Sequence, residues 1–586
     1  MKKVRVLVID SGIQADVCNI VESYALECIN GNYNIIKTSC TDYVGHGTAV
    51  ANIILSTNPD IEIISIRICD NELEIDESGL IAVLQYVYQY INVDIINISA
   101  GITYIEEFKD LEKICSKIRD KGILIVSAFD NDGAISFPAA FDSVIGVDVM
   151  SVFDNSNEMI RIENSIVDIF VPNHYYRTKF LEKRTIIKGT SFACAYVTGL
   201  ISKNIGRLDF PDKDKIINML TNTTRKIDSF AKANIPCFDI KKAIIFPVNK
   251  ESHALLQFSE ELTFDIYGVY DDKAMGKIGN SLYGKVIRSY DDIDWEDDFD
   301  TIILSCISDL SKITKRNYIE EILVNSKKYK KQIYSFESIK SNYEKLFYSK
   351  IDKAMVPEKN MLKLHKNTMP VVAVFGTSSK QGKYTLQQKL CISLKKLGYD
   401  VGFLSTEPSG FLFGADEVFH FGYKAEINLQ PWECISILNE MVWNIQLKGK
   451  DILITGCQSG IVHYNHSKIT DYDIYQYAYL LGVLPDFPIL CVNPHDDIDY
   501  ISRSIGFINS VCEEKVKAIV IFPLIAIQTL SGIGYKIEKI KKDMEFLLKK
   551  NLKDAFNIPV FSLDDENLID DLCIMILNTY KIEYNL

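Results

Sequence analysis

Three short segments, far apart in the chain, carry an aspartate, a histidine and a serine in that order. Asp10 stands in VIDSGI, His46 in GHGTAVA and Ser191 in GTSFA. A serine hydroxyl is a poor nucleophile at neutral pH, and it needs a base within hydrogen-bond reach and a third group that orients the base. Taken singly, the segments are ordinary: a strand end, a glycine turn and a helix N-cap. Taken together, they require a fold that brings three distant segments into contact.

This order and these neighbours resemble the subtilisin-like serine proteases. The resemblance implies a doubly wound parallel α/β sheet and the hydrolysis of peptide bonds. In that mechanism Ser191 attacks, His46 accepts its proton, and Asp10 holds the imidazole tautomer and stabilises the imidazolium. After the serine, Phe192 and Ala195 stand where the family has methionine and proline. Proline in the first turns mainly fixes a helix start, so we expect Ala195 to alter the geometry modestly.

A fourth segment, IVSAFDNDG at residues 125–133, resembles the subtilase strand that ends in Ala-Gly-Asn. By that resemblance Asn131 supplies the side-chain amide of the oxyanion hole, where a fixed donor stabilises the charge of the tetrahedral intermediate. The backbone N–H of Ser191, at a helix start, is the second donor expected there. Asp130 replaces the usual glycine and adds a charge near the site. The alternative for Asn131 is a turn residue in a polar loop.

Substrate contact is expected where the run VDIINISAG, residues 93–101, ends in small residues. The run resembles the subtilase strand that pairs with the substrate backbone. An extended peptide beside such an edge gains main-chain hydrogen bonds while its alternate side chains enter pockets. Ser99, Ala100 and Gly101 are the predicted substrate-binding residues. The alternative is a buried strand without a substrate role.

Composition and the start of the chain favour a cytoplasmic bacterial protein. Asp10 lies so close to Met1 that we expect neither a secretory signal nor a folding pro-segment. Fourteen cysteines occur without a C-x-x-C pair, which is typical of reduced thiols rather than disulfides or a zinc site. No apolar run reaches the length of a membrane span. The net charge of −14 comes without a basic face, which argues against a nucleic-acid partner. No acidic loop specifies calcium, so no metal site is predicted.

The length of 586 residues exceeds one compact core, and three α/β domains are predicted. Residues 1–248 form the subtilisin-like domain, residues 255–365 a small Rossmann-like domain, and residues 368–586 a P-loop NTPase-like domain. The middle assignment depends on strand-like runs that alternate with helical patterns. Its glycines do not form GxGxxG, so dinucleotide binding is only weakly indicated.

The third domain opens with the apolar run VVAVF at residues 371–375, followed by GTSSKQGKYT at residues 376–385. A strand, a glycine loop and a helix in this order point backbone N–H groups at an anion, with a lysine for a phosphate and a threonine for Mg²⁺. ATP or GTP with Mg²⁺ is the predicted ligand, and a glycine turn without a ligand is the alternative. The predicted binding residues are Gly376, Thr377, Gly382, Lys383 and Thr385.

This loop has one residue more than the usual Walker A spacing. It resembles the P-loop of dethiobiotin synthetase and of a large uncharacterised P-loop family, and DILITGCQSG at residues 451–460 resembles that family's second phosphate-side strand. Where the family has an acid for Mg²⁺, this chain has Thr455, a poorer ligand for a hard cation. We therefore expect phosphate binding without hydrolysis. The resemblance also implies links with acyl transfer to amino acids and with clostridial peptide maturation.

The leading hypothesis is an intracellular serine endopeptidase that processes a precursor or leader peptide and needs no cofactor for proteolysis. Its C-terminal domain binds a phosphate or nucleotide. The alternative is a nucleotide- or acyl-dependent transferase, or a binding protein, whose subtilase domain only holds peptide. A third hypothesis is a protease whose cleavage rate responds to ATP or GTP. The sequence specifies neither the scissile residue nor the oligomeric state.

Overall fold

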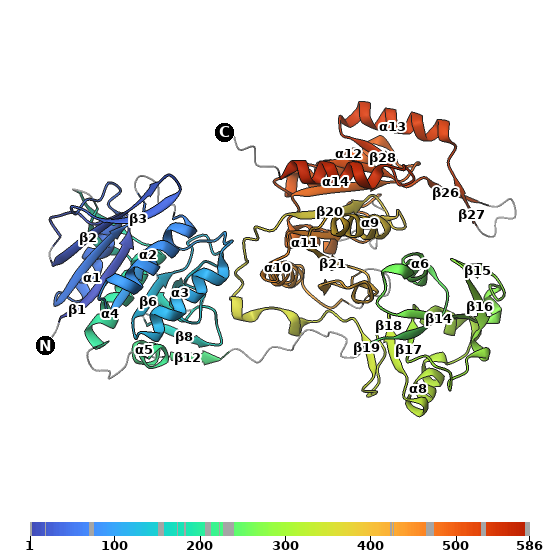
Figure 1. Ribbon diagram of the computed structural model, residues 1–586, viewed down its shortest axis with the longest axis horizontal. Helices are drawn as coiled ribbons and strands as arrows, with labels where there is room; N and C mark the ends of the chain where they lie inside the picture. Colours follow the sequence, from blue (N-terminus) through green and yellow to red (C-terminus); the bar gives the residue numbers. More distant parts are fainter. Residues whose placement is uncertain are drawn as a thin grey trace. The chain divides into compact units, whose positions relative to one another are not determined.

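The chain forms two compact units in the computed structural model shown in Figure 1. The first unit contains Met1–Phe230 and Pro357–Thr368, and the second contains Ala231–Val356 and Met369–Leu586. The structure describes residues 3–17, 19–69, 75–150, 158–172, 174–180, 183–205, 212–221, 223–226, 239–421, 425, 427–464, 474–528 and 535–580. Within these residues, no helix combines the length and the apolar character needed to cross a bilayer.

A ten-stranded sheet forms the centre of the first unit. Its strands are β1 (Val4–Asp10), β2 (Ile20–Ile29), β3 (Asn32–Lys37), β4 (Ile61–Arg67), β5 (Ile95–Ile98), β6 (Leu124–Ala128), β7 (Ile145–Met150), β8 (Ile160–Glu163), β9 (Ile169–Pro172) and β12 (Thr223–Lys226). They lie in the order β12-β8-β9-β7-β6-β5-β1-β4-β2-β3, and the strands from β9 to β2 in this order pair in parallel. The predicted parallel α/β fold is confirmed.

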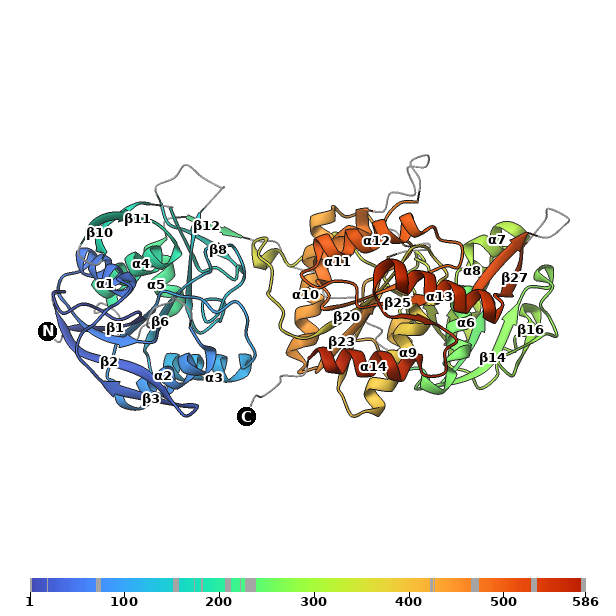
Figure 2. The ribbon, with the colours of Figure 1, turned by 90° about the horizontal axis from the view of Figure 1, so that it is seen from above.

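Helices cover both faces of this sheet (Figure 2). α1 (His46–Thr57) and α4 (Thr190–Asn204) pack together on one face, and α2 (Glu77–Tyr90) and α3 (Phe108–Asp120) pack together on the other. The sequence of β1 explains why helices pack on both faces of the sheet. Val6 and Val8 join the core under α1 and α4, while the intervening Leu7 and Ile9 are buried on the opposite face. A strand buried on both faces reads as an unbroken apolar run.

The remaining elements of the first unit come shortly before or after α4 in the sequence. They are the hairpin of β10 (Tyr176–Phe180) and β11 (Lys183–Ile187), and the helix α5 (Lys213–Leu220). The β11 strand leads directly into the segment that carries Ser191.

The second unit begins with a seven-stranded sheet. Its strands are β13 (Lys242–Phe246), β14 (Asp265–Asp271), β15 (Ser281–Leu282), β16 (Lys285–Ser289), β17 (Thr301–Leu304), β18 (Gln332–Ser335) and β19 (Leu346–Tyr348). Without the short antiparallel β15, the order β16-β14-β13-β17-β18-β19 is the 3-2-1-4-5-6 order of Rossmann folds. Its helices are α6 (Lys250–Gln257), α7 (Ser308–Thr314) and α8 (Tyr318–Tyr329).

A second seven-stranded sheet follows, with every pair parallel. Its strands are β20 (Val371–Gly376), β21 (Val401–Ser405), β22 (Glu417–Val418), β23 (Ile452–Gly456), β24 (Phe487–Val492), β25 (Ala518–Ile521) and β28 (Val560–Ser562), in the order β22-β21-β23-β20-β24-β25-β28. The helices are α9 (Lys383–Lys396), α10 (Pro431–Leu447), α11 (Ile474–Val483), α12 (Ile498–Val511), α13 (Lys542–Phe556) and α14 (Leu568–Thr579). β26 (Leu524–Gln528) and β27 (Tyr535–Lys539) form a separate hairpin.

Successive side chains of β20 point to opposite faces of this second sheet and contribute to two hydrophobic cores. Val371, Ala373 and Phe375 pack with residues of α10, α11, α12 and α13. Val372 and Val374 pack with residues of α9 and α14. β20 therefore lies buried between two helical layers, and the loop that follows it meets the start of α9.

Two domain boundaries differ from the prediction. β13, at residues 242–246, precedes the predicted boundary at residue 248, because its apolar run pairs with β14 and β17 rather than with the first sheet. Residues 357–368 were expected at the end of the Rossmann-like domain and the start of the P-loop domain. They belong instead to the first unit, because their contacts are made there.

Candidate active site

Asp10 ends β1 and meets His46, the first residue of α1. Its Oδ1 atom accepts hydrogen bonds from Nδ1 of His46 at 2.8 Å and from the backbone N–H of Ser11 at 2.7 Å. Gly47 permits this approach, because an added Cβ would lie 2.2 Å from the carbonyl oxygen of Gly12. The glycine after His46 thus has a packing role beside the predicted catalytic pair.

Asp42 organises the loop that carries His46, although the sequence analysis did not single it out. Its Oδ1 atom accepts hydrogen bonds from the N–H of Gly45 and from the hydroxyl of Ser11. Its Oδ2 atom accepts from both the N–H and the hydroxyl of Thr48. An acidic residue just before a helix is a common cap for the unpaired N–H groups of the first turn. That position was the available signal in the sequence.

The surroundings of His46 raise its pKa above the ordinary 6.5. Burial by itself lowers this pKa, since a buried imidazolium loses solvation. The negative charge and hydrogen bond of Asp10, with the charge of Asp42, outweigh the effect of burial. Because a carboxylate can only accept, the neutral ring carries its proton on Nδ1 and leaves Nε2 basic.

Ser191 lies in the first turn of α4, where backbone N–H groups have no partner within the helix. The helix follows Gly189, whose φ of 143° favours glycine. Phe192 stands where the resemblance predicts methionine, and its ring centroid lies 5.2 Å from that of His46. The ring therefore packs against the imidazole. Ala195, in the predicted proline position, is wholly buried in the helix.

Thr190 orients the side chain of Asn131. The Oδ1 atom of Asn131 accepts hydrogen bonds from the N–H and from the hydroxyl of Thr190, both at 3.1 Å. A backbone N–H can only donate, so the oxygen of the amide faces Thr190 and the Nδ2 amino group faces elsewhere. Among the residues that the structure describes, the amino group has no hydrogen-bond partner, and it belongs to a side chain beside the first turn of α4, which suits an oxyanion hole.

Asp130 is occupied by its own loop. Its Oδ2 atom accepts hydrogen bonds from the N–H groups of Asp132 and Ala134, and its N–H donates to the hydroxyl of Ser136. The charge that the sequence analysis expected near the site is thus shared with backbone donors of the loop. Ser136 also faces Gly101, where an added Cβ would lie 2.5 Å from the Ser136 hydroxyl.

A cavity of about 340 Å³ brings these groups together. It is lined by all four predicted catalytic residues and all three predicted substrate-binding residues: Asp10, His46, Asn131, Ser191, Ser99, Ala100 and Gly101. Phe129, Asp130 and Phe192 also line it. The fold therefore gathers at one cavity every residue predicted for proteolysis.

The predicted substrate segment, residues 99–101, follows β5 and lines the cavity. The hydroxyl of Ser99 accepts a hydrogen bond from Nδ2 of Asn97 at 2.6 Å. The Oδ1 atom of Asn97 in turn accepts one from Thr198 of α4 at 2.8 Å. The Ser99 side chain is therefore part of the core between β5 and α4. This leaves the backbone of the segment, rather than that hydroxyl, to contact a ligand.

Cys69 is a second potential nucleophile in the lining of this cavity. Burial, followed by the negative charges of Asp10 and Asp42, raises its pKa to about 12. Because the thiolate is the nucleophilic form, this thiol is inert at neutral pH.

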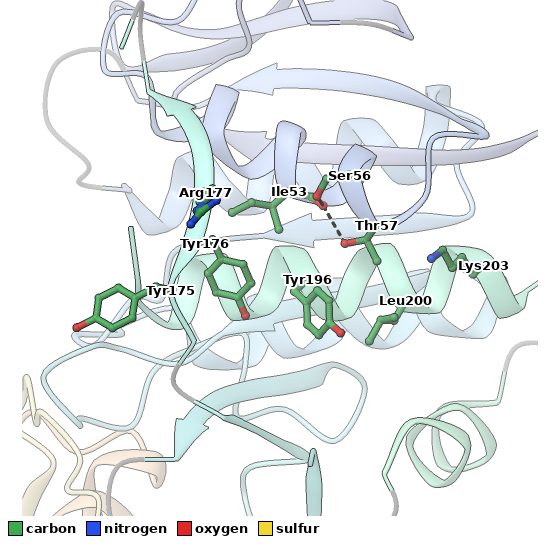
Figure 3. Close-up of a pocket in the computed structure, with 9 residues that line it drawn as sticks. All are labelled: Ile53, Ser56, Thr57, Tyr175, Tyr176, Arg177, Tyr196, Leu200 and Lys203. Atoms are coloured by element: carbon green, nitrogen blue, oxygen red, sulfur yellow. Dashed lines mark hydrogen bonds between the residues drawn. The ribbon is translucent and has the colours of Figure 1, made fainter. Parts of the chain in front are cut away.

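A second cavity of the first unit, of about 420 Å³, lies between β10, the last turn of α1, and α4 (Figure 3). The rings of Tyr176 and Tyr196 line it with their centroids 6.1 Å apart, and Arg177 and Lys203 add positive charge. None of the predicted catalytic residues lines it. It is thus separate from the cavity that holds Ser191.

In the second unit, the side chain of Gln381 fills the predicted P-loop. Its Oε1 atom accepts a hydrogen bond from the N–H of Ser378 at 3.0 Å, and its Nε2 atom donates to the hydroxyl of Thr377 at 2.5 Å. Lys383, the first residue of α9, donates to the carbonyl oxygens of Ser378 at 2.6 Å and Ser459 at 3.1 Å. No pattern in the sequence indicates these internal acceptors.

A phosphate oxygen fits the same donors. The Ser378 N–H already holds an oxygen acceptor, and an added Cβ at Gly376 would lie 2.4 Å from it. Gly376 therefore keeps this space open. Gly382 has a φ of 69° and packs so tightly that an added Cβ would lie 2.6 Å from the side chain of Leu563. Both predicted glycines are required by the loop geometry.

Magnesium fits the described residues less well than phosphate does. Thr385 is half-buried in the first turn of α9, and a hydroxyl there is the Mg²⁺ ligand of a P-loop. Thr455, at the position of the family acid, is fully buried. Its hydroxyl is bonded to the carbonyl oxygen of Leu404 and to the hydroxyl of Tyr479. A neutral hydroxyl in that position supplies no charge to a hard cation.

The chain is similar to known proteins in two regions. The subtilase family model matches residues 1–235, and the model of a P-loop domain of unknown function, DUF1611_C, matches residues 359–540. A crystal structure of a cold-adapted subtilisin-like serine proteinase is 21% identical, over 37% of this chain and 80% of that chain, with a TM-score of 0.31. No curated protein matches the chain. The two family matches confirm the predicted subtilase and P-loop assignments.

Proposed function

We propose that this chain, which carries a subtilase-family domain at residues 1–235, is a serine endopeptidase that acts through an acyl-enzyme. Ser191 attacks the scissile carbonyl carbon while Nε2 of His46 accepts the hydroxyl proton. That proton passes to the leaving amine, which departs and leaves an ester on Ser191. A water molecule, deprotonated by His46, then cleaves the ester and restores the free hydroxyl.

The observation that carries the proposal is the 2.8 Å hydrogen bond between Asp10 and His46 beside the cavity that Ser191 also lines. A carboxylate at Nδ1 selects the tautomer in which Nε2 is the base, and it stabilises the imidazolium that forms. Burial of the pair strengthens this effect, because few water molecules screen the two charges. No such arrangement is needed for a domain that only holds peptide.

Asn131 adds independent support. Its amide oxygen is taken by Thr190, so the donor end of the amide is the end available to a ligand in the cavity. Together with the backbone N–H of Ser191, it forms a pair of donors suited to the oxyanion of the tetrahedral intermediate. A fixed donor of this kind contributes about 3 kcal/mol to transition-state stabilisation.

An extended peptide is the substrate that suits this cavity. Its backbone pairs with the backbone of residues 99–101, which line the cavity after β5. We further infer that the peptide is a precursor or leader processed in the cytoplasm of a bacterium, since the protease is fused to a P-loop domain of a kind that resembles peptide-maturation proteins. This step depends on analogy with those proteins.

A fluorophosphonate probe tests the proposal, because it reacts only with an activated serine. The full-length chain is expected to be labelled at Ser191 and to cleave an unstructured protein substrate. Ser191→Ala should abolish both signals. Ser56→Ala, at the far end of α1 and outside the cavity, is the matched control and should retain both. Equal labelling of the Ser191→Ala variant would contradict the assignment.

The second candidate is a nucleotide- or acyl-dependent transferase, or a binding protein, whose subtilase domain only holds peptide. The observation in its favour is the P-loop, where the Ser378 N–H and the Lys383 ammonium group each donate to an oxygen atom. It predicts that the wild-type chain resists the fluorophosphonate yet binds ATP or GTP in a manner that depends on Lys383. The same two measurements therefore separate the two functions.

A further inference from the structure

Residues 357–368, which we call the strap, pack on the subtilase domain although in sequence they lie between the two sheets of the second unit. The contacts are specific. The Lys359 carbonyl oxygen accepts a hydrogen bond from the N–H of Ile166, and the Leu364 carbonyl oxygen accepts one from the N–H of Ile135 at 3.0 Å. The strap thus forms backbone hydrogen bonds with two separate loops of the first unit.

Lys363 anchors the strap through a buried ion pair. Its Nζ atom lies 2.6 Å from Oδ2 of Asp148 on β7, and both side chains are no more than 10% exposed. A buried ammonium group is tolerated only when a carboxylate or several acceptors compensate its lost solvation. The pair therefore holds the strap in one position on β7.

The same ammonium group lies over the ring of Phe129, 5.4 Å from its centroid. Met361 of the strap packs in the cluster that contains Phe129. On β7, an added Cβ at Gly146 would lie 2.8 Å from the Phe129 ring. The ring is therefore enclosed between β7 and the strap, and it is 1% exposed.

These contacts bracket the predicted oxyanion donor. Phe129 lies two residues before Asn131 and lines the active-site cavity, while Ile135, four residues after it, is bonded to the strap. Asn131 itself is exposed and is held by Thr190 alone among the hydrogen bonds described above. The strap is thus bonded or packed on both sides of the loop that carries the donor.

The far end of the strap contacts Tyr104 and Ile105 of the first unit. The Thr368 hydroxyl donates to the carbonyl oxygen of Ile105 at 3.4 Å, and the ammonium group of Lys366 lies 5.2 Å from the ring centroid of Tyr104. These residues follow the predicted substrate segment, residues 99–101. The twelve-residue strap therefore contacts two chain segments that contribute residues to the lining of the cavity, residues 99–105 and 129–135.

We propose that the strap, through Lys363, is a positioning element that holds the loop of residues 129–135 so that Asn131 points into the oxyanion hole. Lys363 does not touch substrate and acts through Phe129 and Ile135. This inference rests on the proposed peptidase function. It adds to that function the claim that a segment outside the first 235 residues of the chain sets the efficiency of the active site.

The test compares Lys363→Met with Lys366→Met in the full-length chain. Lys363→Met keeps the length of the side chain but removes the ion pair with Asp148 and the cation over Phe129. We expect kcat to fall by about 10- to 100-fold, as small displacements of catalytic groups produce, with KM within about twofold. The acidic limb of the pH profile should not move, since it reports His46. Lys366→Met removes only the contact with Tyr104, which lies outside the loop of residues 129–135, so it should match the wild type.

A double-mutant cycle identifies the route of the effect. If Lys363 acts through the oxyanion donor, Asn131→Ala with Lys363→Met should be no slower than Asn131→Ala alone, because the donor is already absent. Additive losses in the double variant would overturn the proposal and leave Lys363 with a general stabilising role. Asp148→Asn, which preserves volume and hydrogen bonding, provides the second variant if Lys363→Met does not fold.

Hydrogen exchange separates failure of this inference from failure of the proposed function. The Ile135 amide, bonded to the Leu364 carbonyl oxygen, should exchange about tenfold faster in Lys363→Met than in the wild type or in Lys366→Met. Unchanged protection overturns the proposal whether or not the chain cleaves peptides. If the Ile135 amide exchanges faster in Lys363→Met but the wild-type chain cleaves no peptide, the peptidase function is refuted, and with it the catalytic role of the strap. The contact by which the strap holds the loop is then still supported.

Discussion

At the scale of the residue, the chemistry depends on carboxylates that hold other groups in place. Asp10 bonds to His46 and to the backbone N–H of Ser11 through one oxygen atom, and Asp42 bonds to the hydroxyl of Ser11 and to Thr48. The two carboxylates are thus linked through Ser11. Asp10 therefore holds the imidazole ring, and Asp42 holds the first turn of the helix that carries it.

The first prediction concerns the dependence of hydrolysis on pH. His46 must be neutral to accept a proton, and its pKa is raised above 6.5, so kcat/KM should fall as the pH drops through a value above 6.5. Asp10→Asn should lower the rate by about 10⁴-fold. It should also move the acidic limb to lower pH, because the charge that raised the pKa of His46 is gone. An unmoved limb would show that another group controls it.

The same raised pKa affects stability with a definite sign. The folded chain binds the His46 proton more tightly than the unfolded chain does. The resulting stabilisation is therefore fully present below pH 6.5 and is lost as the pH rises through the folded pKa. Asp10→Asn should remove this pH dependence, which chemical denaturation at several pH values measures. A wild type and a variant with the same pH dependence would contradict the assignment.

The second prediction concerns Asn131 and Thr190. Asn131→Ala should lower kcat by about 10²- to 10³-fold with little change in KM, because the donor acts only on the charged intermediate. Thr190→Val removes one of the two hydrogen bonds that orient the amide and keeps the backbone N–H. Its effect on kcat should be clearly smaller. Steady-state kinetics measures both, and a Thr190→Val loss as large as that of Asn131→Ala would mean that the hydroxyl has a role of its own.

At the scale of elements, the site depends on how closely α1 and α4 approach the ends of β1 and β6. The third prediction tests one such approach. Gly47→Ala places a Cβ where only 2.2 Å separates it from the Gly12 carbonyl oxygen, so the helix must shift. We expect a loss of about 2 kcal/mol or more in the free energy of unfolding and a loss of fluorophosphonate labelling.

Gly506→Ala is the control for this prediction. Gly506 lies within α12, and an added Cβ there meets nothing within 4 Å. Alanine is the better helix former, so this variant should be stabilised by about 0.5–1 kcal/mol and labelled normally. A Gly47→Ala chain as stable as the wild type would show that α1 moves without cost.

At the scale of the whole molecule, the two units carry different sites. The fourth prediction changes the site of the second unit and measures both. A ligand at a concentration of about 100 Kd stabilises the fold that binds it by about 2.7 kcal/mol, or about 5–10 °C in Tm for a fold of this size. ATP or GTP should raise one thermal transition by this amount. Lys383→Ala should abolish the shift while leaving the labelling of Ser191 intact.

Lys395→Ala is the matched control, since Lys395 is exposed at the opposite end of α9. It should keep both the shift and the labelling. A nucleotide shift that persists in Lys383→Ala would place the ligand elsewhere. Because Gln381 occupies the loop, Gln381→Ala should increase the affinity for nucleotide.

The sequence alone predicted the fold class and the identities of the residues at the cavity. Short stretches of sequence indicate both the fold class and these residues. The apolar run of β1 indicates a strand buried on two faces, and short motifs that contain glycine surround Asp10, His46 and Ser191. The parallel α/β fold is confirmed, and the predicted residues line one cavity. Ser99 shows the limit, because only packing could show that its hydroxyl bonds within the core.

The tertiary structure alone decided what holds the site together. The packing of Phe192 on the imidazole, the Gln381 side chain in the P-loop and the strap leave no local motif, and the position of Asp42 before a helix does not show which groups it bonds. Lys363 and Asp148 are far apart in the chain, and neither has a neighbouring pattern that indicates the other. Such pairs form because burial forces a charged group to find a partner, and the identity of that partner depends on where the whole fold brings the chain.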